Sequence, residues 1–190
     1  DGFEQRLQET IWLILERDWP ALEEVNYSTI QKTKRLLMVL SEAVPLTPNM
    51  TELFAAVETN REGGLRMLYT LEKAGVLRLI TREPRSIGTL RKPDKIYMGN
   101  SNLMHALSSN TNIGTIRETF FCNQLLEAGH EVNLAKKGDF IVDSQYTFEV
   151  GGGSKTFKQI RDVQDSYLAV DNTPIGDVNR IPLWLFGFLY

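Results

Sequence analysis

The stretch GDFIVDSQYTFEVGGGSK, residues 138–155, is the sequence feature that most constrains the fold. Two short apolar runs flank a polar turn, and each run carries one acid, Asp139 or Glu149. We place a three-residue hairpin turn at residues 144–146. Side chains alternate between the two faces of a strand, so both acids then lie on one face. The opposite face carries the larger apolar side chains, Phe140, Val142, Phe148 and Val150.

This register pairs Ile141 with Glu149 and makes Asp139 its diagonal neighbour. Two half-buried carboxylates at that spacing repel, unless a proton or a cation relieves the repulsion. Carboxylate oxygens are ligands that Mg²⁺ prefers, so the pair predicts a Mg²⁺ or Mn²⁺ site. Glu118, in the first turn of the preceding predicted helix, is a natural third acid.

Each acid also has a structural interpretation. Glu118 lies three residues after Thr115, which is the spacing of a helix capping box. Asp139 has the alternative explanation of a turn residue at the start of a strand. Glu149 lies between Phe148 and Val150 and is the acid that structure alone explains least well.

The chain before this hairpin has the pattern of a winged helix-turn-helix. We predict helices over 3–17 (ended by Pro20), 29–44, 51–58 and 61–75, with a capping box of Thr59 and Glu62 before the last. Strands at 76–80 and 95–98 follow, joined by a polar loop. The two glycines within the last helix indicate either close approach of a partner or a loose helix start.

Charge separates this region from the rest of the chain. Residues 61–95 contain 9 basic and 4 acidic side chains, a net charge of +5, whereas residues 1–60 carry −5. A basic segment within an acidic chain predicts an anion-binding surface, with duplex DNA as the partner. An ordinary solvated surface and a protein–protein adaptor are the alternatives. The residues expected to contact phosphates are Arg61, Arg66, Arg82, Arg85, Arg91 and Lys92.

The second half predicts an α/β domain of order αβββαβ. A short helix at 101–108 precedes a helix from Thr115 to Gly129, then strands at 130–135, 139–143 and 146–150. A helix over 156–167, a strand at 167–171 and an apolar C-terminal segment complete the order. The predicted domains are a helical tail at 1–26, a winged helix at 27–99 and the α/β domain at 100–190.

A helix acid, an Asp and then a Glu on adjacent strands resemble the pattern of the PD-(D/E)XK nuclease superfamily. The chain more closely resembles the C-terminal half of a group of bacterial and archaeal AAA-type ATPases. In those proteins a winged helix precedes a nuclease-like domain of unknown function. The resemblance covers roughly residues 90–190 and rests on KPDKIYMGNSNLMHAL, IRETFFCNQLLEAGHEV, GDFIVDSQYTFEVGG and IPLWLFGFLY. It implies a restriction-endonuclease-like core with Glu118, Asp139 and Glu149 as metal ligands, and the backbone carbonyl of Val150 as a fourth.

The chain departs from the superfamily at Gly151, where the pattern has a catalytic lysine two residues after the glutamate. Loss of one such electrostatic donor typically lowers turnover by about 10²–10³-fold. Lys155 could reach back over the glycines at 151–153, and Lys136, Lys137 and Lys158 are weaker candidates. The glycines themselves fit a tight strand-to-helix passage, or a nest of backbone amides for an anion.

Several functions are excluded or disfavoured by the sequence. No G-x-x-x-x-G-K-[ST] motif occurs, so this chain has no ATP site of that type. A single cysteine, Cys122, excludes an internal disulfide and favours the cytoplasm. No apolar run approaches the roughly 20 residues that span a bilayer. The chain starts at Asp1 rather than Met, so we expect it to be a fragment of a longer protein.

Three functional hypotheses follow. The first is a regulatory, DNA-interacting C-terminal region of an ATPase, whose nuclease-like domain has lost activity. The second is an active metal-dependent nuclease that uses Lys155. The third is an interaction scaffold that docks on the ATPase module or on a second copy, through Trp12, Trp19 or the segment IPLWLFGFLY.

Overall fold

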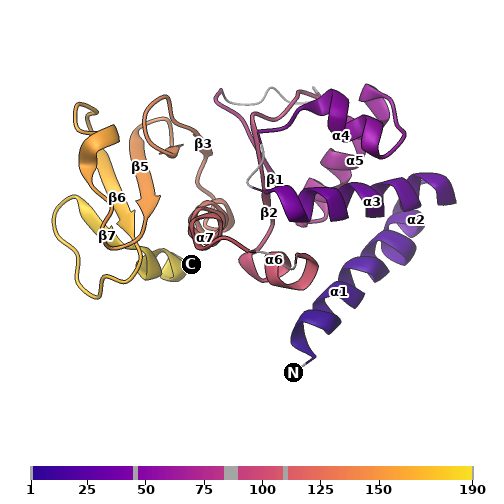
Figure 1. The fold of residues 1–190 in the computed structure, drawn as a ribbon, viewed down its shortest axis with the longest axis horizontal. Coiled ribbons are helices and arrows are strands. Elements are labelled where there is room, and N and C mark those ends of the chain that lie inside the picture. Colours follow the sequence, from indigo (N-terminus) through magenta and orange to yellow (C-terminus); the bar gives the residue numbers. More distant parts are fainter. Residues whose placement is uncertain (1, 45–46, 84–89, 109–110, 190) are drawn as a thin grey trace. The chain divides into compact units, whose positions relative to one another are not determined.

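The computed structural model describes residues 2–44, 47–83, 90–108 and 111–189. Helices and strands are mixed, and the chain divides into two compact units (Figure 1). The first unit comprises residues 1–79 and 87–111, and the second comprises residues 80–86 and 112–190. Within the described residues, no helix has both the length and the apolar character needed to cross a membrane.

The first unit begins with a continuous helical segment. It consists of α1 (Phe3–Leu13), the π-helical turn η1 (Ile14–Asp18) and α2 (Trp19–Leu22). The prediction that Pro20 ends this helix is therefore wrong. Proline has no amide hydrogen to donate to the preceding turn, and the wider π-helical turn before it accommodates that loss.

The helices α3 (Tyr27–Ala43), α4 (Met50–Ala56) and α5 (Arg61–Lys73) follow. The strands β1 (Leu77–Ile80) and β2 (Lys95–Met98) pair in a two-stranded sheet, and α6 (Ser101–Leu107) comes next. Leucines of α3 and α5 and apolar side chains of both strands form the buried core.

Two local predictions for α5 are corrected. Asn60, rather than Thr59, caps the helix, because its side-chain oxygen accepts the Gly63 amide at 2.8 Å. The glycine at position 64 is explained within the unit, since a β-carbon there would lie 2.3 Å from the Phe54 ring. Close packing of α4 on α5 therefore requires this glycine.

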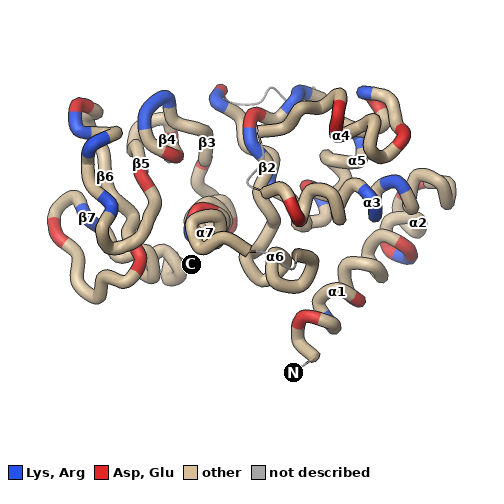
Figure 2. Tube along the Cα trace, viewed as in Figure 1, with Lys and Arg blue, Asp and Glu red and all other residues tan. Residues whose placement is uncertain are grey.

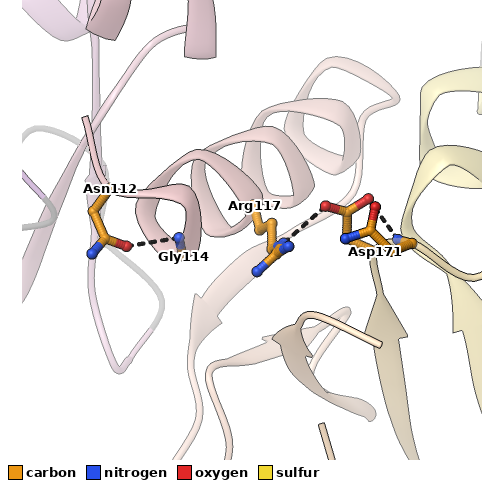
Figure 3. Close-up of polar contacts among 5 residues, drawn as sticks. Asn112, Gly114, Arg117 and Asp171 are labelled. Atoms are coloured by element: carbon orange, nitrogen blue, oxygen red, sulfur yellow. Dashed lines mark hydrogen bonds and ion pairs between the residues drawn. The ribbon is translucent and has the colours of Figure 1, made fainter. Parts of the chain in front are cut away.

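The second unit is built on α7 (Ile113–Glu127). Its N-cap is Asn112, whose side chain accepts the amide of Gly114 at 2.7 Å (Figure 3). The predicted capping box of Thr115 and Glu118 is therefore wrong, because an asparagine three residues earlier starts the helix. Glu118 lies beyond the first turn, and the capping role that offered a structural explanation for it disappears.

Five strands form one sheet in chain order, β3 (Val132–Leu134), β4 (Phe140–Val142), β5 (Tyr146–Gly151), β6 (Ser166–Val170) and β7 (Arg180–Pro182). The first three strands are antiparallel, and β6 and β7 run parallel to β5. The 3₁₀ helix η3 (Leu183–Phe188) closes the chain. On one face, Phe121 of α7 packs against Phe140, Phe148 and Phe186.

The hairpin register differs from the prediction by one pair. Phe140 lies opposite Phe148, and the loop occupies residues 143–145 because Tyr146 already belongs to β5. The prediction that Ile141 pairs with Glu149 is therefore wrong, and Thr147 is its partner. The loop keeps three residues, so the alternation is preserved and the two acids share a face as predicted.

The predicted helix over 156–167 is also wrong. Only a 3₁₀ turn, η2 (Phe157–Gln159), forms in the passage from β5 to β6. Phe157, Ile160 and Val163 recur every third residue. The Ile160 amide donates to the Phe157 carbonyl and the Val163 amide to the Ile160 carbonyl, which closes turns of that length. These side chains pack on Leu168 and Val170, so the short passage covers the sheet face opposite α7.

Candidate functional site

Glu149 lies at the centre of the second unit. It belongs to the middle strand β5, pairs with Leu168 of β6, and its side chain is 0% exposed. The Lys155 ammonium lies 2.6 Å from its Oε1 as an ion pair. Apart from that contact, neither carboxylate oxygen has a hydrogen-bond donor among the described residues. A fully buried carboxylate whose only donor is one ammonium is costly, so the fold alone does not account for it.

Asp139 precedes β4 and lies across from Glu149 when the hairpin register is continued by one pair. Its amide donates to the Phe148 carbonyl at 2.9 Å, and its Oδ2 accepts the Val150 amide at 2.7 Å. Burial raises the pKa of Asp139 to about 6. The Val150 amide opposes that rise, while the charges of Glu118 and Glu149 add to it.

Lys155 reaches Glu149 through the space that a side chain at position 151 would fill. A β-carbon at Gly151 would lie 2.7 Å from Cδ and 3.0 Å from Cγ of Lys155. The aliphatic stem therefore folds back over Gly151, and the ammonium lies beside the buried glutamate. Burial alone would lower the pKa of Lys155, but the hydrogen bond and charge of Glu149, with the charges of Asp139 and Glu118, raise it.

Glu118 approaches this group from α7. It is half-buried, and its charge acts on both Asp139 and Lys155. The four predicted residues, Glu118, Asp139, Glu149 and Lys155, thus form one electrostatic group. Over residues 2–44, 47–83, 90–108 and 111–189, no three Asp, Glu, His or Cys side chains lie close enough together to hold a metal ion.

The other lysines that the sequence suggested lie elsewhere. Lys136, Lys137 and Lys158 are exposed, and none forms an ion pair with the acids in the described part of the chain. The glycine loop makes a tight turn, in which the Lys155 amide donates to the Gly152 carbonyl at 2.9 Å. This geometry is that of a compact passage between strands, which also carries Lys155 back to the sheet.

Two arginines that the sequence analysis missed hold this loop. Arg117 of α7 pairs through Nε with Asp171 at 2.9 Å, and Asp171 also accepts the Asn172 amide (Figure 3). The Asp171 amide donates to the Gly151 carbonyl at 2.8 Å, which anchors the start of the loop. Arg180 of β7 donates to the carbonyls of Gly153 and Lys155. No spacing rule links residues 25 or more positions apart, so only the fold reveals these contacts.

The predicted DNA-contacting residues fall in different parts of the chain. Arg61 and Arg66 are exposed on α5, and Arg91 and Lys92 are exposed before β2. Arg66 pairs with Glu62 at 2.8 Å, which reduces the positive charge that α5 presents. Arg82 is exposed in the segment grouped with the second unit, and Arg85 lies outside the described residues.

Acidic positions accompany basic ones along the helices of the first unit (Figure 2). A cleft of about 760 Å³ beside α5 is lined by Arg66 and Lys73 and also by Glu23, which pairs with Lys73 at 3.4 Å. Trp19 forms another part of this cleft and donates to Glu23. The face of α5 is therefore mixed in charge, more so than the sequence total of +5 suggests.

The geometry of the site is the basis for assigning its chemistry. Comparison of the chain with protein-family models, with curated proteins and with solved structures finds no match.

Proposed function

We propose that the second unit carries a divalent-metal-dependent site for hydrolysis of nucleic-acid phosphodiesters. The observation that carries this proposal is the path of Lys155 over Gly151 to Glu149, at 2.6 Å. The nuclease pattern has its cation at the position of Gly151. Here that space holds the stem of Lys155, so a cation occurs at the corresponding place although the residue number differs.

Charge supports a metal at this site. Three acids and one lysine leave a formal charge of −2 when all are ionised, which a divalent cation would offset. The acids offer hard oxygen atoms, and among the described residues the buried Oε2 of Glu149 has no hydrogen-bond donor, while its Oε1 has only the Lys155 ammonium. Asp139 and Glu149 would hold the ion, with the Val150 carbonyl and water as further ligands. Glu118 would act on it through its charge, because the described residues do not bring all three acids within reach of one ion. A bound Mg²⁺ or Mn²⁺ ion would supply Lewis-acid activation of water and of the phosphate.

Lys155 would act as an electrostatic group rather than as a base. Its pKa is raised, so it remains an ammonium at neutral pH and cannot accept the proton of the attacking water. It can donate hydrogen bonds to that water and to a non-bridging phosphate oxygen. In the hydrolysis the water oxygen bonds to phosphorus and its proton passes to solvent, one phosphorus–oxygen ester bond breaks, and the departing oxygen is protonated from solvent. Stabilising the charge that develops on phosphate is the largest expected contribution of such a donor.

Plasmid cleavage with Mn²⁺ tests the proposal. Glu149→Gln should abolish cleavage, and Lys155→Met should lower it by about 10²–10³-fold, because Met keeps the stem but removes the charge. The double variant Gly151→Lys with Lys155→Ala moves the ammonium to the superfamily position and should recover activity relative to Lys155→Ala. Arg161→Gln, at an exposed position, is the matched control. Cleavage that survives Glu149→Gln would reject the proposed site.

A second candidate function concerns the first unit, which we propose binds duplex DNA. The order α3, α4, α5, β1 and β2 supports a winged helix, in which α5 would be the recognition helix. Exposed Arg61, Arg66, Arg91 and Lys92 would contact phosphates. With three or four phosphate contacts, log affinity should fall with log salt at a slope of about −3 to −4. Fluorescence anisotropy that shows no salt dependence would count against this role.

In a longer protein these two units would serve as the DNA-interacting C-terminal region of an AAA-type ATPase, as the resemblance implies. A scaffold that docks on the ATPase module or on a second copy is the alternative. It is favoured by one observation, the exposure of Trp184 and Phe188 in the segment IPLWLFGFLY, at 51% and 75%. Trp12 and Trp19 are half-buried by comparison. Dimers in sedimentation that dissociate on Trp184→Ser would support the scaffold.

A further inference from the structure

The loop that delivers Lys155 is unusually free of side chains. Gly151, Gly152 and Gly153 follow one another, and glycine lacks the β-carbon that restricts backbone angles in other residues. A loop of this composition would, by itself, place its last residue over a wide range of positions. An ammonium held 2.6 Å from a buried carboxylate therefore requires a restraint from outside the loop.

Arg180 provides such a restraint at the end of the loop. Its Nη1 donates to the Lys155 carbonyl at 3.1 Å, and its Nη2 donates to the Gly153 carbonyl. One planar guanidinium thus bonds the backbone on both sides of Ser154. The arginine itself is fixed, because it lies in β7 opposite Leu168 and its backbone bonds to Asp177. A strand two places from β5 in the sheet consequently sets the backbone of Lys155.

The start of the loop is held independently. The Asp171 amide bonds to the Gly151 carbonyl, and Asp171 is held in turn by Arg117 (Figure 3). Anchoring Gly151 does not fix Lys155, because two further glycines lie between them. Besides the bond within the loop from the Lys155 amide to the Gly152 carbonyl, Arg180 is the contact from outside the loop that fixes the backbone at Lys155.

We propose that Arg180 is a positioning residue for Lys155, and that its forked contact with the loop sets the ammonium against Glu149. The inference rests on the proposed function for its catalytic meaning, but its structural content can be measured without activity. A lysine at position 180 could donate to the same carbonyls but lacks the rigid fork that bonds both at once. Arg180→Lys should therefore preserve part of the positioning of the Lys155 ammonium, and Arg180→Gln should preserve little of it.

The direct measurement is the NMR signal of the Lys155 side chain in protein labelled with ¹³C-lysine, assigned through the Lys155→Met variant. In the wild type this signal should have the chemical shift and low mobility of a side chain held in one place beside Glu149. In Arg180→Gln it should move towards the signal of a free lysine and become more mobile, because the ammonium spends less time beside Glu149. Arg161→Gln should leave it unchanged. A folded Arg180→Gln protein with the wild-type Lys155 signal would overturn the proposal.

A second variant separates loop positioning from general loss of structure. A β-carbon at Gly153 would have no contact closer than 3.5 Å, to the Asp171 carbonyl, so alanine fits there. Gly153→Ala narrows the backbone freedom that Arg180 otherwise restricts. When Gly153→Ala is added to Arg180→Gln, the NMR signal of Lys155 should return part of the way to that of the wild type. Absence of any restoration would contradict a role in ordering the loop.

Kinetics provide the remaining test. Arg180→Gln should lower turnover by about tenfold, less than removal of the ammonium itself, with KM and Mn²⁺ affinity unchanged. In a Lys155→Met background Arg180→Gln should have no further effect on turnover, whereas a separate structural role would make the losses additive. If Arg180→Gln does not fold, the same NMR and kinetic measurements can be made on Arg180→Lys, for which smaller changes are expected. If the wild type cleaves nothing, the proposed function fails, while the NMR result still decides the role of Arg180.

Discussion

Replacing Asp139 by asparagine should stabilise the protein at neutral pH and leave it unchanged in acid. The pKa of Asp139 is about 6 in the folded protein and 3.8 in its ordinary state. Below pH 3.8 the group is protonated in both folded and unfolded chains and contributes no difference. Between pH 3.8 and 6 the folded protein retains a proton that the unfolded chain has lost, so stability falls as pH rises. Above pH 6 Asp139 is ionised in both states, and the loss of stability that its buried charge causes is constant.

The size of the effect follows from the same values. One pKa unit corresponds to about 1.36 kcal/mol, so the full difference is about 3 kcal/mol. The carboxyl is half-buried rather than enclosed, and solvent screening reduces the expected gain to about 1–2 kcal/mol. Asparagine keeps an oxygen that can accept the Val150 amide at its present 2.7 Å, so the substitution removes the charge and not the hydrogen bond.

Urea unfolding between pH 4 and pH 8, with EDTA present, measures this prediction. The difference in unfolding free energy between Asp139→Asn and the wild type should be near zero at pH 4 and should reach a constant value above pH 7. Asp162→Asn, at an exposed position, is the control and should show no such rise. If Asp139→Asn raised the unfolding free energy equally at every pH, or lowered it at pH 8, the reasoning about Asp139 would be refuted.

Three further outcomes follow. Lys155→Met should lower the unfolding free energy by about 2–4 kcal/mol, because it leaves the buried charge of Glu149 without a partner, and adding Glu149→Gln should recover much of the loss in a denaturant titration. Gly151→Ala should displace the Lys155 stem, which its β-carbon would meet at 2.7 Å, and so abolish the raised Lys155 pKa in an NMR titration. Gly64→Ala should cost about 1–3 kcal/mol in thermal unfolding, because its β-carbon overlaps the Phe54 ring; a wild-type melting temperature would contradict that packing.

Alternation along the strands was enough to predict that Asp139 and Glu149 share a face, because that result depends only on whether the loop has an odd number of residues. The register itself depends on whether Tyr146 belongs to the loop or to β5. Both choices give a three-residue loop and bury the same phenylalanines and valines. The sequence pattern therefore could not separate them, although the choice decides whether the acids are diagonal or directly opposite.

Helix starts were harder to predict, because two capping residues compete. Asn112 and Thr115 each precede a plausible helix, and the Thr115 pattern even provides the glutamate of a capping box. The structure starts α7 after Asn112. The passage after β5 was mistaken for a helix because Phe157, Ile160 and Val163 suit either a helical face or successive tight turns. Contacts such as Arg180 with Lys155 join distant segments and have no local signature.

Because of the compact passage after β5, the position of the Lys155 ammonium in space does not follow from its position in the sequence. Searches that require a lysine two residues beyond the glutamate would pass over a protein built this way. Here an absent side chain at position 151 makes room for another that arrives from four residues downstream. Three-dimensional templates of charge, matched on ammonium and carboxylate positions, would recover such proteins where linear motifs fail.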